Sequence, residues 1–429
     1  MTGGRRLDLR AVLAVRVEET TTGFPAGADL AVADVGSRGW NLFEDLVPPV
    51  VVLRERALEH NLELMSAYCR ANGVELAPHG KTSMAPQLWA RQLDAGAWGV
   101  TAATPVQARA MRSAGVPRIL LADELVDAGS IGWVARELAD EAFGFACWVD
   151  STRGVELLRE GLVAGGAPRP LSVPVELGHA RGRSGCRSVA EALDLAALVH
   201  EAPDLALVGV AGYEGTVCGD RGPVCVDAVD AFLHDLRELT SELLARGAFD
   251  TAGEAIVSAG GSAFFDRVVA VLGKSSAAGA AVRLVLRSGC YLTHDHGVYE
   301  RNSPLSAATD PGGRFLPAFE AWGAVLSRPE TRVVVVGLGK RDVPSDIDLP
   351  VPLRIRRSTG SFTDAAGIVV RRLMDQHAIC DVGGSGAPPD VGDLVAFGVS
   401  HPCTAFDRRR VIPVVDDDDR VVDAVATLF

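Results

Sequence analysis

The chain has 429 residues, of which 48% are hydrophobic and 23% are charged. That balance excludes a disordered or low-complexity protein and leaves room for two or three domains, including a closed α/β barrel. The net charge of −13 argues against a nucleic-acid-binding surface. Neither a signal peptide nor a membrane-spanning segment is recognisable, and the eight cysteines include no CxxC pair. A cytoplasmic protein with reduced cysteines and no disulfide framework is therefore expected.

Short runs rich in Val, Leu and Ala alternate with helix-like stretches over much of the first 300 residues. Eight of these runs are expected to be strands: Val74–Ala77, Gly99–Ala102, Arg118–Leu121, Gly144–Val149, Leu171–Leu177, Ala206–Gly212, Glu254–Ser258 and Val282–Leu286. Helices are expected between them, among others at Pro86–Ala95, Pro105–Ala114, Val155–Leu162, Val189–Val199 and Val226–Arg246. Eight strands joined by seven crossovers predict a closed parallel (β/α)8 barrel, with an open doubly wound sheet as the competing architecture.

An earlier apolar run, Pro49–Leu53, is followed by an amphipathic stretch over Arg56–Ala71. We expect this pair to supply a lead-in strand and the helix that precedes the first barrel strand.

The pattern changes after about Tyr299, where residues 300–315 are rich in Asn, Ser, Pro, Asp and Gly. Further short strands are expected at Trp322–Leu326, Thr331–Val336, Leu353–Ile355, Gly367–Val370, Ala378–Val382 and Asp393–Val399. The sequence thus predicts three parts: an N-terminal segment (1–45) that joins a β-domain, a barrel (46–300) and a C-terminal antiparallel β-domain (301–429). The acidic run Asp416–Asp419 is interpreted as a solvated turn between strands rather than as a metal site.

Polar or glycine-bearing residues directly follow each expected barrel strand. In chain order they are Lys81, Thr101 with Thr104, Asp123, Asp150, Glu176–Gly185, Gly212–Thr216, Ser258–Ser262 and Ser288–Tyr291. Loops at the C-terminal ends of barrel strands form one face, and barrel enzymes hold their catalytic groups there. Because Gly, Ser and Asp are also ordinary turn residues, a plain turn is the alternative for each of them, above all for Asp123 and Asp150.

The segment SAGGS (Ser258–Ser262) has the features of an anion-binding loop. Successive glycines let backbone N–H groups approach an anion closely, and a following helix would add a favourable dipole. Loops after the seventh and eighth strands are also the usual phosphate site of such barrels. The sequence therefore predicts a phosphorylated ligand held by Ser258, Gly260, Gly261 and Gly289.

Lys81 lies in the segment PHGKTSMAPQL, beside Pro78 and Gly80 rather than in a charged run. A partly desolvated lysine at a barrel mouth can act as an amine nucleophile or base, whereas the alternative is a surface lysine in a turn. A lysine and a phosphate site on the same face together indicate pyridoxal phosphate as the cofactor.

The segment SHPCTAFD (Ser400–Asp407) places His401 and Cys403 two residues apart. In an extended chain these two side chains point to the same side, and imidazole with thiolate favours zinc over magnesium or calcium. Two protein ligands would leave positions open for water or substrate. A buried histidine and a buried cysteine without a metal are the alternative.

With Lys81, the Ser258 loop and the His401/Cys403 pair, the chain resembles the pyridoxal-phosphate enzymes of the alanine racemase fold (fold type III), and more closely the D-serine dehydratase and D-threonine aldolase group. The resemblance implies an alanine racemase-like barrel followed by a β-domain, and a homodimer. It implies that Lys81 forms the Schiff base with the cofactor, and that His401 and Cys403 bind zinc. The cofactor-binding residues that it implies are Lys81, Arg183, Tyr213, Ser258, Gly260, Gly261, Gly289 and Tyr291, with Arg181 as an alternative to Arg183.

The cysteine at position 403 resembles the dehydratase branch, since the aldolase branch has an aspartate there. The resemblance thus implies a zinc-dependent dehydratase that converts a D-3-hydroxy amino acid, such as D-serine or D-threonine, into a 2-oxo acid and ammonia. Ser83 and Met84 depart from the more polar pair of many relatives, which leaves the substrate open. Alternatives are a D-threonine aldolase-type retro-aldol lyase, an amino acid racemase with Tyr291 or Tyr299 as a second acid/base, and a non-catalytic pyridoxal-phosphate-binding protein.

Overall fold

The structure, a computed structural model, describes residues 6–251, 254–273, 282–306, 313–384 and 387–429. The chain divides into two compact units, which we call the barrel unit and the sheet unit. The barrel unit comprises Met1–Leu7, Ser66–Lys81 and Gln92–Gly289, and the sheet unit comprises Asp8–Met65, Thr82–Arg91 and Cys290–Phe429. This division differs from the expected boundaries at residues 45 and 300, because the chain enters each unit more than once.

The barrel unit contains eight strands, all paired in parallel. They are β4 (Glu75–Leu76), β5 (Val100–Ala102), β6 (Arg118–Glu124), β7 (Gly144–Trp148), β8 (Leu171–Leu177), β9 (Leu205–Gly212), β10 (Ala255–Ala259) and β11 (Val282–Leu286). Strands that neighbour each other in the chain also pair in the sheet, and β4 pairs with β11. A parallel bridge between His79 and Thr101, just beyond β4 and β5, connects the remaining two ends. The predicted closed barrel is confirmed, and the open sheet is excluded.

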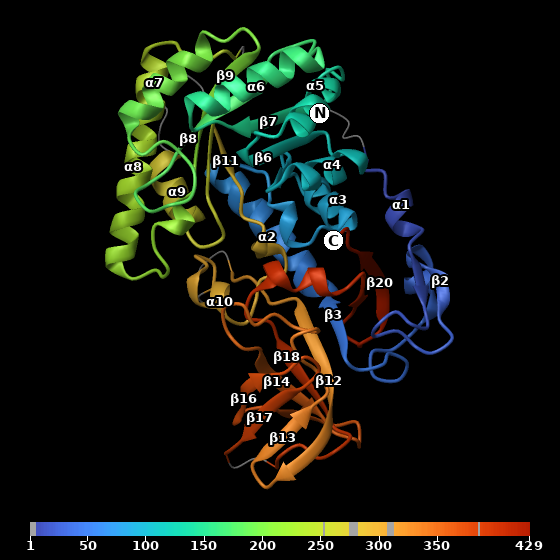
Figure 1. Ribbon diagram of the computed structural model, residues 1–429. Helices are drawn as coiled ribbons and strands as arrows, with labels where there is room; N and C mark the ends of the chain where they lie inside the picture. Colours follow the sequence, from blue (N-terminus) through green and yellow to red (C-terminus); the bar gives the residue numbers. More distant parts are fainter. Residues whose placement is uncertain (1–5, 252–253, 274–281, 307–312, 385–386) are drawn as a thin grey trace. The chain divides into compact units, whose positions relative to one another are not determined.

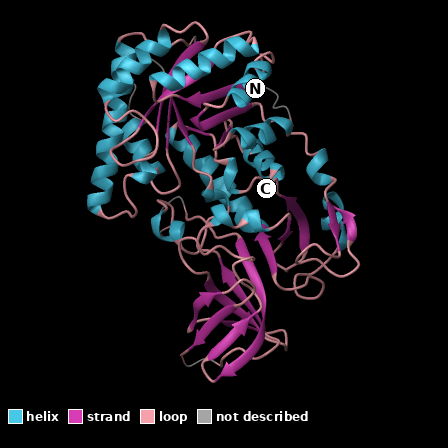
Figure 2. Cartoon of the chain, viewed as in Figure 1, coloured by secondary structure: helices cyan, strands magenta, loops and turns pink. Residues whose placement is uncertain are grey.

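Helices separate the strands and surround them on the outside, as Figures 1 and 2 show. They are α4 (Pro105–Ser113), α5 (Ala128–Glu137), α6 (Thr152–Gly165), α7 (Val189–His200), α8 (Pro223–Ala245) and α9 (Phe265–Leu272). Four of them begin at a side chain that accepts a hydrogen bond from the first turn: Thr104, Asp127, Ser151 and Ser188. Each such cap stabilises a helix start by about 1 kcal/mol and fixes where the preceding loop ends. Helices α2 (Glu55–Asn72) and α3 (Pro86–Asp94) include residues of both units.

Apolar side chains fill the inside of the barrel. Six buried residues from five barrel segments form one cluster: Ala77, Leu120, Ala146, Trp148, Ala211 and Val285. Further along the chain, charged side chains replace the apolar ones at Glu124, four residues after Leu120, and at Arg287, two residues after Val285. Because side chains alternate along a strand, residues separated by an even number of positions point to the same side. The barrel interior therefore changes from apolar side chains to charged ones toward the C-terminal ends of the strands, where barrel enzymes hold their catalytic groups.

The sheet unit is built around one ten-stranded sheet. Its strands are β3 (Val50–Arg54), β12 (Phe319–Glu330), β13 (Val333–Val336), β14 (Val351–Arg356), β15 (Phe362–Asp364), β16 (Ile368–Leu373), β17 (Ala378–Val382), β18 (Leu394–Gly398), β19 (Val411–Val415) and β20 (Val421–Ala426). The long strand β12 pairs with β3, β13 and β18. The predicted antiparallel β-domain is therefore present, and β19 and β20 form a hairpin around Asp416–Asp419.

One expected barrel element belongs to this sheet instead. The run that was expected to be a lead-in strand is β3, which pairs antiparallel with β12 and parallel with β19. A continuous run of buried valines suits either kind of sheet, and its partners lie more than 250 residues later in the chain. Sequence periodicity alone could not choose between the two.

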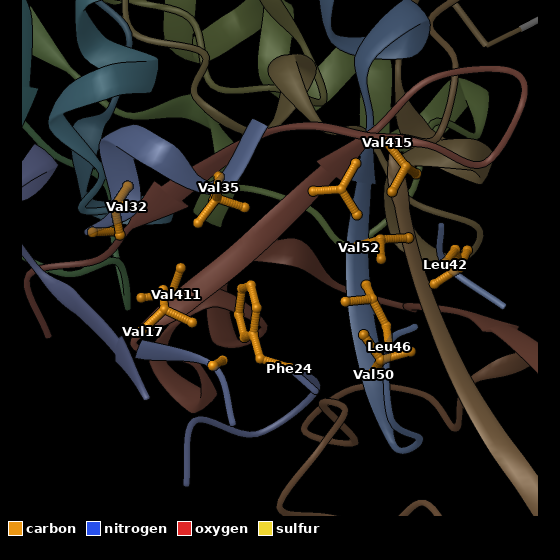
Figure 3. Close-up of a cluster of buried hydrophobic side chains, with 14 of the residues drawn as sticks. Val17, Phe24, Val32, Val35, Leu42, Leu46, Val50, Val52, Val411 and Val415 are labelled. Carbon is orange, nitrogen blue, oxygen red and sulfur yellow. The ribbon is translucent and has the colours of Figure 1, made fainter. Parts of the chain in front are cut away.

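The N-terminal residues pack on the same sheet. They form helix α1 (Arg10–Leu13), the 3₁₀ segment η1 (Val32–Arg38) and a small antiparallel pair, β1 (Arg16–Glu18) with β2 (Asp29–Ala31). Their buried side chains, among them Val17, Phe24 and Val35, share a core with Val50 of β3 and Val411 of β19 (Figure 3). A short helix, α10 (Val298–Asn302), completes the elements of the sheet unit.

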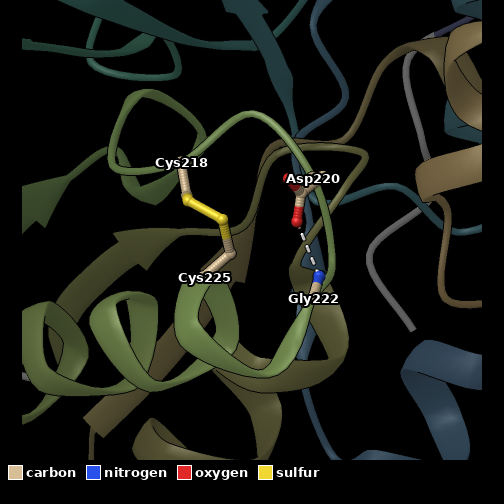
Figure 4. The surroundings of a disulfide bond; sticks show 4 residues. All are labelled: Cys218, Asp220, Gly222 and Cys225. Atoms are coloured by element: carbon tan, nitrogen blue, oxygen red, sulfur yellow. Dashed lines mark hydrogen bonds between the residues drawn. A yellow bond between two sulfur atoms is a disulfide. The ribbon is translucent and has the colours of Figure 1, made fainter.

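The loop between β9 and α8 contains a disulfide that the sequence analysis did not expect. Cys218 follows the 3₁₀ turn η3 (Glu214–Thr216) and bonds to Cys225 in the first turn of α8, while Asp220 accepts a hydrogen bond from the Gly222 N–H (Figure 4). The expectation that all cysteines are reduced is therefore wrong for this pair, because the turn at Asp220 brings together two residues seven positions apart. Within the described residues, no helix combines the length and apolarity needed to cross a bilayer.

Candidate active site

Lys81 lies on the short 3₁₀ turn η2 (Gly80–Thr82), directly after β4, and is half-buried. The pKa of the neighbouring His79 lies well below its usual value. Burial is the main cause, and the positive charges of Lys81, Arg287 and Arg183 lower it further. Three cationic side chains therefore surround one neutral imidazole at the C-terminal end of the barrel. Such a concentration of positive charge suits a ligand that carries a phosphate.

Arg287 is a site residue that the sequence analysis did not single out. It lies just beyond β11 and is only 5% exposed. Its guanidinium donates to the Ser258 hydroxyl at 2.7 Å and to the Gly212 carbonyl at 2.8 Å, and it stacks over the Trp148 ring at 5.6 Å. The only signal in the sequence was an arginine at the end of an apolar strand.

The predicted phosphate loop forms an anion-binding nest. Gly260, with φ of +95°, follows β10, and a side chain at this position would meet Leu286 at 2.6 Å. The N–H groups of Gly260 and Gly261 both donate to the carboxylate of Glu214, at 3.0 and 2.6 Å. Glu214 is fully buried. Both glycine N–H groups therefore bind the carboxylate of the protein's own Glu214.

Two further predicted residues lie beside this nest. The Arg183 guanidinium lies over the Tyr213 ring at 4.8 Å, and Tyr213 in turn lies so close to Gly261 that a Cβ there would be 2.8 Å from the ring. Gly289 contacts the other end of the site, since its Cβ would be 2.6 Å from the carbonyl oxygen of His79. The barrel unit thus brings Arg183, Tyr213, Gly261 and Gly289 into one connected region.

Tyr291 is a residue of the sheet unit. It belongs to the 3₁₀ turn η5 (Cys290–Leu292) of the sheet unit, is 3% exposed, and its ring lies 5.9 Å from that of Phe315. The structure gives it a packing role within that unit.

A pair of buried carboxyl groups was also missed. Burial, followed by the charges of Glu176 and Asp150, raises the pKa of Glu124 to about 9, so Glu124 is a neutral acid that hydrogen-bonds Glu176. Glu124 is the last residue of β6, and Glu176, 4% exposed, lies in β8. Within the described part of the chain, Oε1 of Glu124 and Oε2 of Glu176 are buried without a hydrogen-bond partner.

The sheet unit assembles the second predicted cluster. His401 Nδ1 lies 2.8 Å from Oδ2 of Asp346, and Thr404 donates to the other oxygen of the same carboxylate at 2.8 Å. Against the effect of burial, hydrogen bonds with Cys403 and then Asp346 raise the pKa of His401 to about 9. Hydrogen bonds from Cys290 first, and from His401, lower the pKa of Cys403 well below its usual value. The two pKa shifts thus favour the charged forms of both side chains.

Cys290 and Thr82 complete this cluster, and the sequence analysis did not identify either. The Sγ atoms of Cys290 and Cys403 are 3.3 Å apart, and the Thr82 hydroxyl lies 3.7 Å from Cys403 Sγ and 3.9 Å from Cys290 Sγ. Their sequence separations of 113 and 321 residues explain why no local pattern indicated them.

The donor set of the pair fits zinc. A carboxylate on Nδ1, here Asp346, leaves Nε2 of His401 for another partner and is the usual support of a zinc-binding histidine. A nitrogen and a thiolate sulfur are donors that zinc prefers. Among the residues that the structure describes, no three His, Cys, Asp or Glu side chains are already grouped around one metal position. The pair alone would be an open, two-ligand site.

Comparisons with known proteins place the fold first. A solved alanine racemase-like protein from Idiomarina loihiensis matches with a TM-score of 0.69 at 17% identity, over 89% of this chain and 96% of that one. The D-threo-3-hydroxyaspartate dehydratase from Delftia sp. HT23 matches with a TM-score of 0.71 at 20% identity, over 89% and 98%. The chain therefore has the fold of the alanine racemase class.

The sequence comparisons are more specific. Residues 318–415 match a family model described as "Putative serine dehydratase domain". A D-threonine aldolase from Arthrobacter sp is 25% identical over 374 residues, which are 86% of this chain and 89% of the relative. With the fold, these matches confirm the resemblance found in the sequence: the chain is similar to the fold type III pyridoxal-phosphate group of D-serine dehydratases and D-threonine aldolases.

Proposed function

We propose that the protein is a pyridoxal-phosphate- and zinc-dependent lyase that eliminates water from a D-3-hydroxy amino acid, giving a 2-oxo acid and ammonia. The main support for the proposal is the arrangement at the C-terminal end of the barrel. A half-buried lysine lies there among cationic groups, and two glycine N–H groups bind the carboxylate of Glu214. Relatives named as aldolases and a dehydratase of D-3-hydroxy amino acids support the substrate class.

For the cofactor, Lys81 would hold the aldehyde through its amine. Ser258, Gly260, Gly261 and Gly289 would surround the phosphate, and Arg183 with Tyr213 would line the ring; Tyr291, in the sheet unit, would contribute by packing. When bound, the cofactor supplies an electron sink that makes loss of a proton from the substrate Cα feasible near neutral pH. The Lys81 amine, once released by the incoming substrate amine, is the base that accepts this proton.

For the metal, His401 and Cys403 would supply the protein ligands, and Asp346 would fix the ring orientation of His401. When bound, zinc supplies a Lewis acid that stabilises a β-oxygen as it leaves. Thiolate sulfur at position 403 supports the dehydratase assignment, since the resemblance associates the aldolase branch with an aspartate there.

Retro-aldol cleavage to glycine and an aldehyde is the second candidate, because a D-threonine aldolase matches over most of the chain. The two reactions use the same substrates, so their products separate them.

The test is a product assay on reconstituted enzyme with D-serine, D-threonine and the isomers of 3-hydroxyaspartate, with the L-amino acids as controls. A 2-oxo acid with stoichiometric ammonia supports the dehydratase, and glycine supports the aldolase. Treatment with a chelator should abolish either activity, and zinc should restore it; activity that is indifferent to chelation would remove the zinc from the proposal. Lys81→Ala should be inactive, whereas the matched variant Lys340→Ala, at an exposed lysine, should retain activity.

We further propose that the protein is a cytoplasmic homodimer. Light scattering should then give a mass near twice the 45.0 kDa of one chain. A mass of one chain at assay concentration would contradict this.

A further inference from the structure

Cys290 and Cys403 are a close pair of thiols, of which the proposed reaction uses only Cys403, as a zinc ligand. Their sulfurs lie 3.3 Å apart, within the sheet unit, on two short 3₁₀ turns, η5 (Cys290–Leu292) and η6 (Pro402–Thr404). A disulfide bond requires about 2.05 Å between sulfurs, so the two atoms need to approach by little more than 1 Å. We propose that Cys290 and Cys403 are an oxidation site that forms a reversible disulfide.

Cys403 is the cysteine that an oxidant should attack first, because it is more exposed than the other free cysteines. Six cysteines are not bonded in a disulfide, and five of them, Cys69, Cys147, Cys186, Cys290 and Cys380, are buried. Cys403 is the one that remains partly accessible. An oxidant from solvent therefore reaches Cys403 first, while the buried Cys290 is already in place to react with the product.

The chemistry balances with hydrogen peroxide as the oxidant. The Cys403 sulfur attacks one peroxide oxygen, the O–O bond breaks, and Cys403 becomes a sulfenic acid with release of one water. The Cys290 sulfur then attacks the Cys403 sulfur, the S–S bond forms, the S–O bond breaks, and a second water leaves. Two thiols and one peroxide thus give one disulfide and two waters, and the two cysteines are oxidised by two electrons in total.

The consequence rests on the proposed function. A Cys403 sulfur in a disulfide is no longer a thiolate, so the His401/Cys403 pair would lose its sulfur donor and its zinc. Conversely, zinc on Cys403 would shield the sulfur from peroxide. The disulfide would then form in metal-free protein exposed to peroxide and would keep the metal-dependent step off until the disulfide is reduced, because zinc could not bind again.

The experiment uses full-length protein, reduced and then treated with peroxide after removal of metal. Peptide mapping should show a cross-linked pair that contains Cys290 and Cys403, with a mass about 2 Da below that of the two free peptides, and dithiothreitol should separate it. Mapping is needed because Cys218 and Cys225 form a separate disulfide. Zinc-loaded protein should cross-link more slowly.

The control variants separate the possible outcomes. Cys290→Ser should give no cross-link, and Cys403 should instead proceed to a sulfinic acid that dithiothreitol does not reverse. Cys380→Ala, at a buried cysteine of β17, should behave as the wild type. A wild type in which Cys403 becomes a sulfinic acid without any cross-link would overturn the inference.

Because the readout is the cross-link, it is independent of lyase activity. If the disulfide forms at the same rate with and without zinc, the oxidation site is supported. The proposed protection by zinc is then contradicted. A protein without lyase activity would still test the site.

Discussion

The buried carboxylate of Glu214 occupies the two N–H groups that a phosphate would need, so it should compete with the cofactor. Its two oxygens accept from Gly260 and Gly261 at 3.0 and 2.6 Å. Replacing Glu214 by Gln leaves one oxygen that can accept and turns an NH₂ group toward the second N–H. Glu214→Gln should therefore bind pyridoxal phosphate more tightly than the wild type.

The magnitude follows from the lost contact. A hydrogen bond to a charged group contributes about 1.5–3 kcal/mol, and loss of one such bond from the competing state raises phosphate affinity about tenfold. The negative charge of Glu214 also attracts the guanidinium of Arg287. Without the carboxylate, the positive charge of Arg287 is more available to an anion.

The assay is a titration of apoprotein with pyridoxal phosphate, followed by absorbance. Pyridoxal, which has no phosphate, is the matched control and should bind both proteins alike. Unchanged or weaker binding of pyridoxal phosphate by the variant, or an equal gain for pyridoxal, would refute competition in the nest.

Three further substitutions test other parts of the structure. Between its usual pKa of 4.5 and its folded value of about 9, Glu124 keeps in the folded state a proton that the unfolded chain has lost, so stability falls as the pH rises through this range. Glu124→Gln should thus raise the free energy of unfolding at about pH 8 by about 1 kcal/mol, after allowance for solvent, and leave it unchanged near pH 4; a pH-independent difference would contradict this. Glu320→Ala removes one of the two carboxylates that pair with Arg54, each at 2.6 Å, and leaves only Asp419, so it should cost about 2–3 kcal/mol in denaturant unfolding. The same change at the exposed Asp381 should cost much less, and equal losses would count against burial as the cause. Gly289→Ala should destabilise the fold by about 1–3 kcal/mol and weaken cofactor binding, since its Cβ would be 2.6 Å from a backbone oxygen; wild-type affinity would contradict that contact.

The barrel could be predicted because its signals are local. Each of its eight strands is an apolar run bounded by turn residues, and the observed bounds lie within a few residues of the expected ones. Helices α5 and α9 were not among the helices for which bounds were predicted, because α5 contains two glycines and α9 has only eight residues. The assignment of β3 failed for a different reason: its pairing with β12 and β19 depends on residues far along the chain.

The candidate site was predictable to the same extent. Residues such as Lys81 and Gly260 could be predicted because they follow a strand. In the structure, charged side chains lie near them. The polar segments predicted after the strands include Glu214 and Cys290, but the roles of Glu214, Arg287 and Cys290 were not predicted. Their importance comes from contacts across 46, 29 and 113 residues of sequence. A side chain that acts through such a contact has no signature in the residues around it.

The amine of Lys81 is the central element of the account, and the chain makes it easy to test, because it contains only three lysines: Lys81, Lys274 and Lys340. Protein reconstituted with pyridoxal phosphate should be reduced with borohydride, digested and mapped by mass spectrometry. The account predicts a pyridoxyl adduct on Lys81 that is absent from Lys81→Ala. An adduct confined to Lys274, Lys340 or the N-terminus, or no adduct at all, would contradict it.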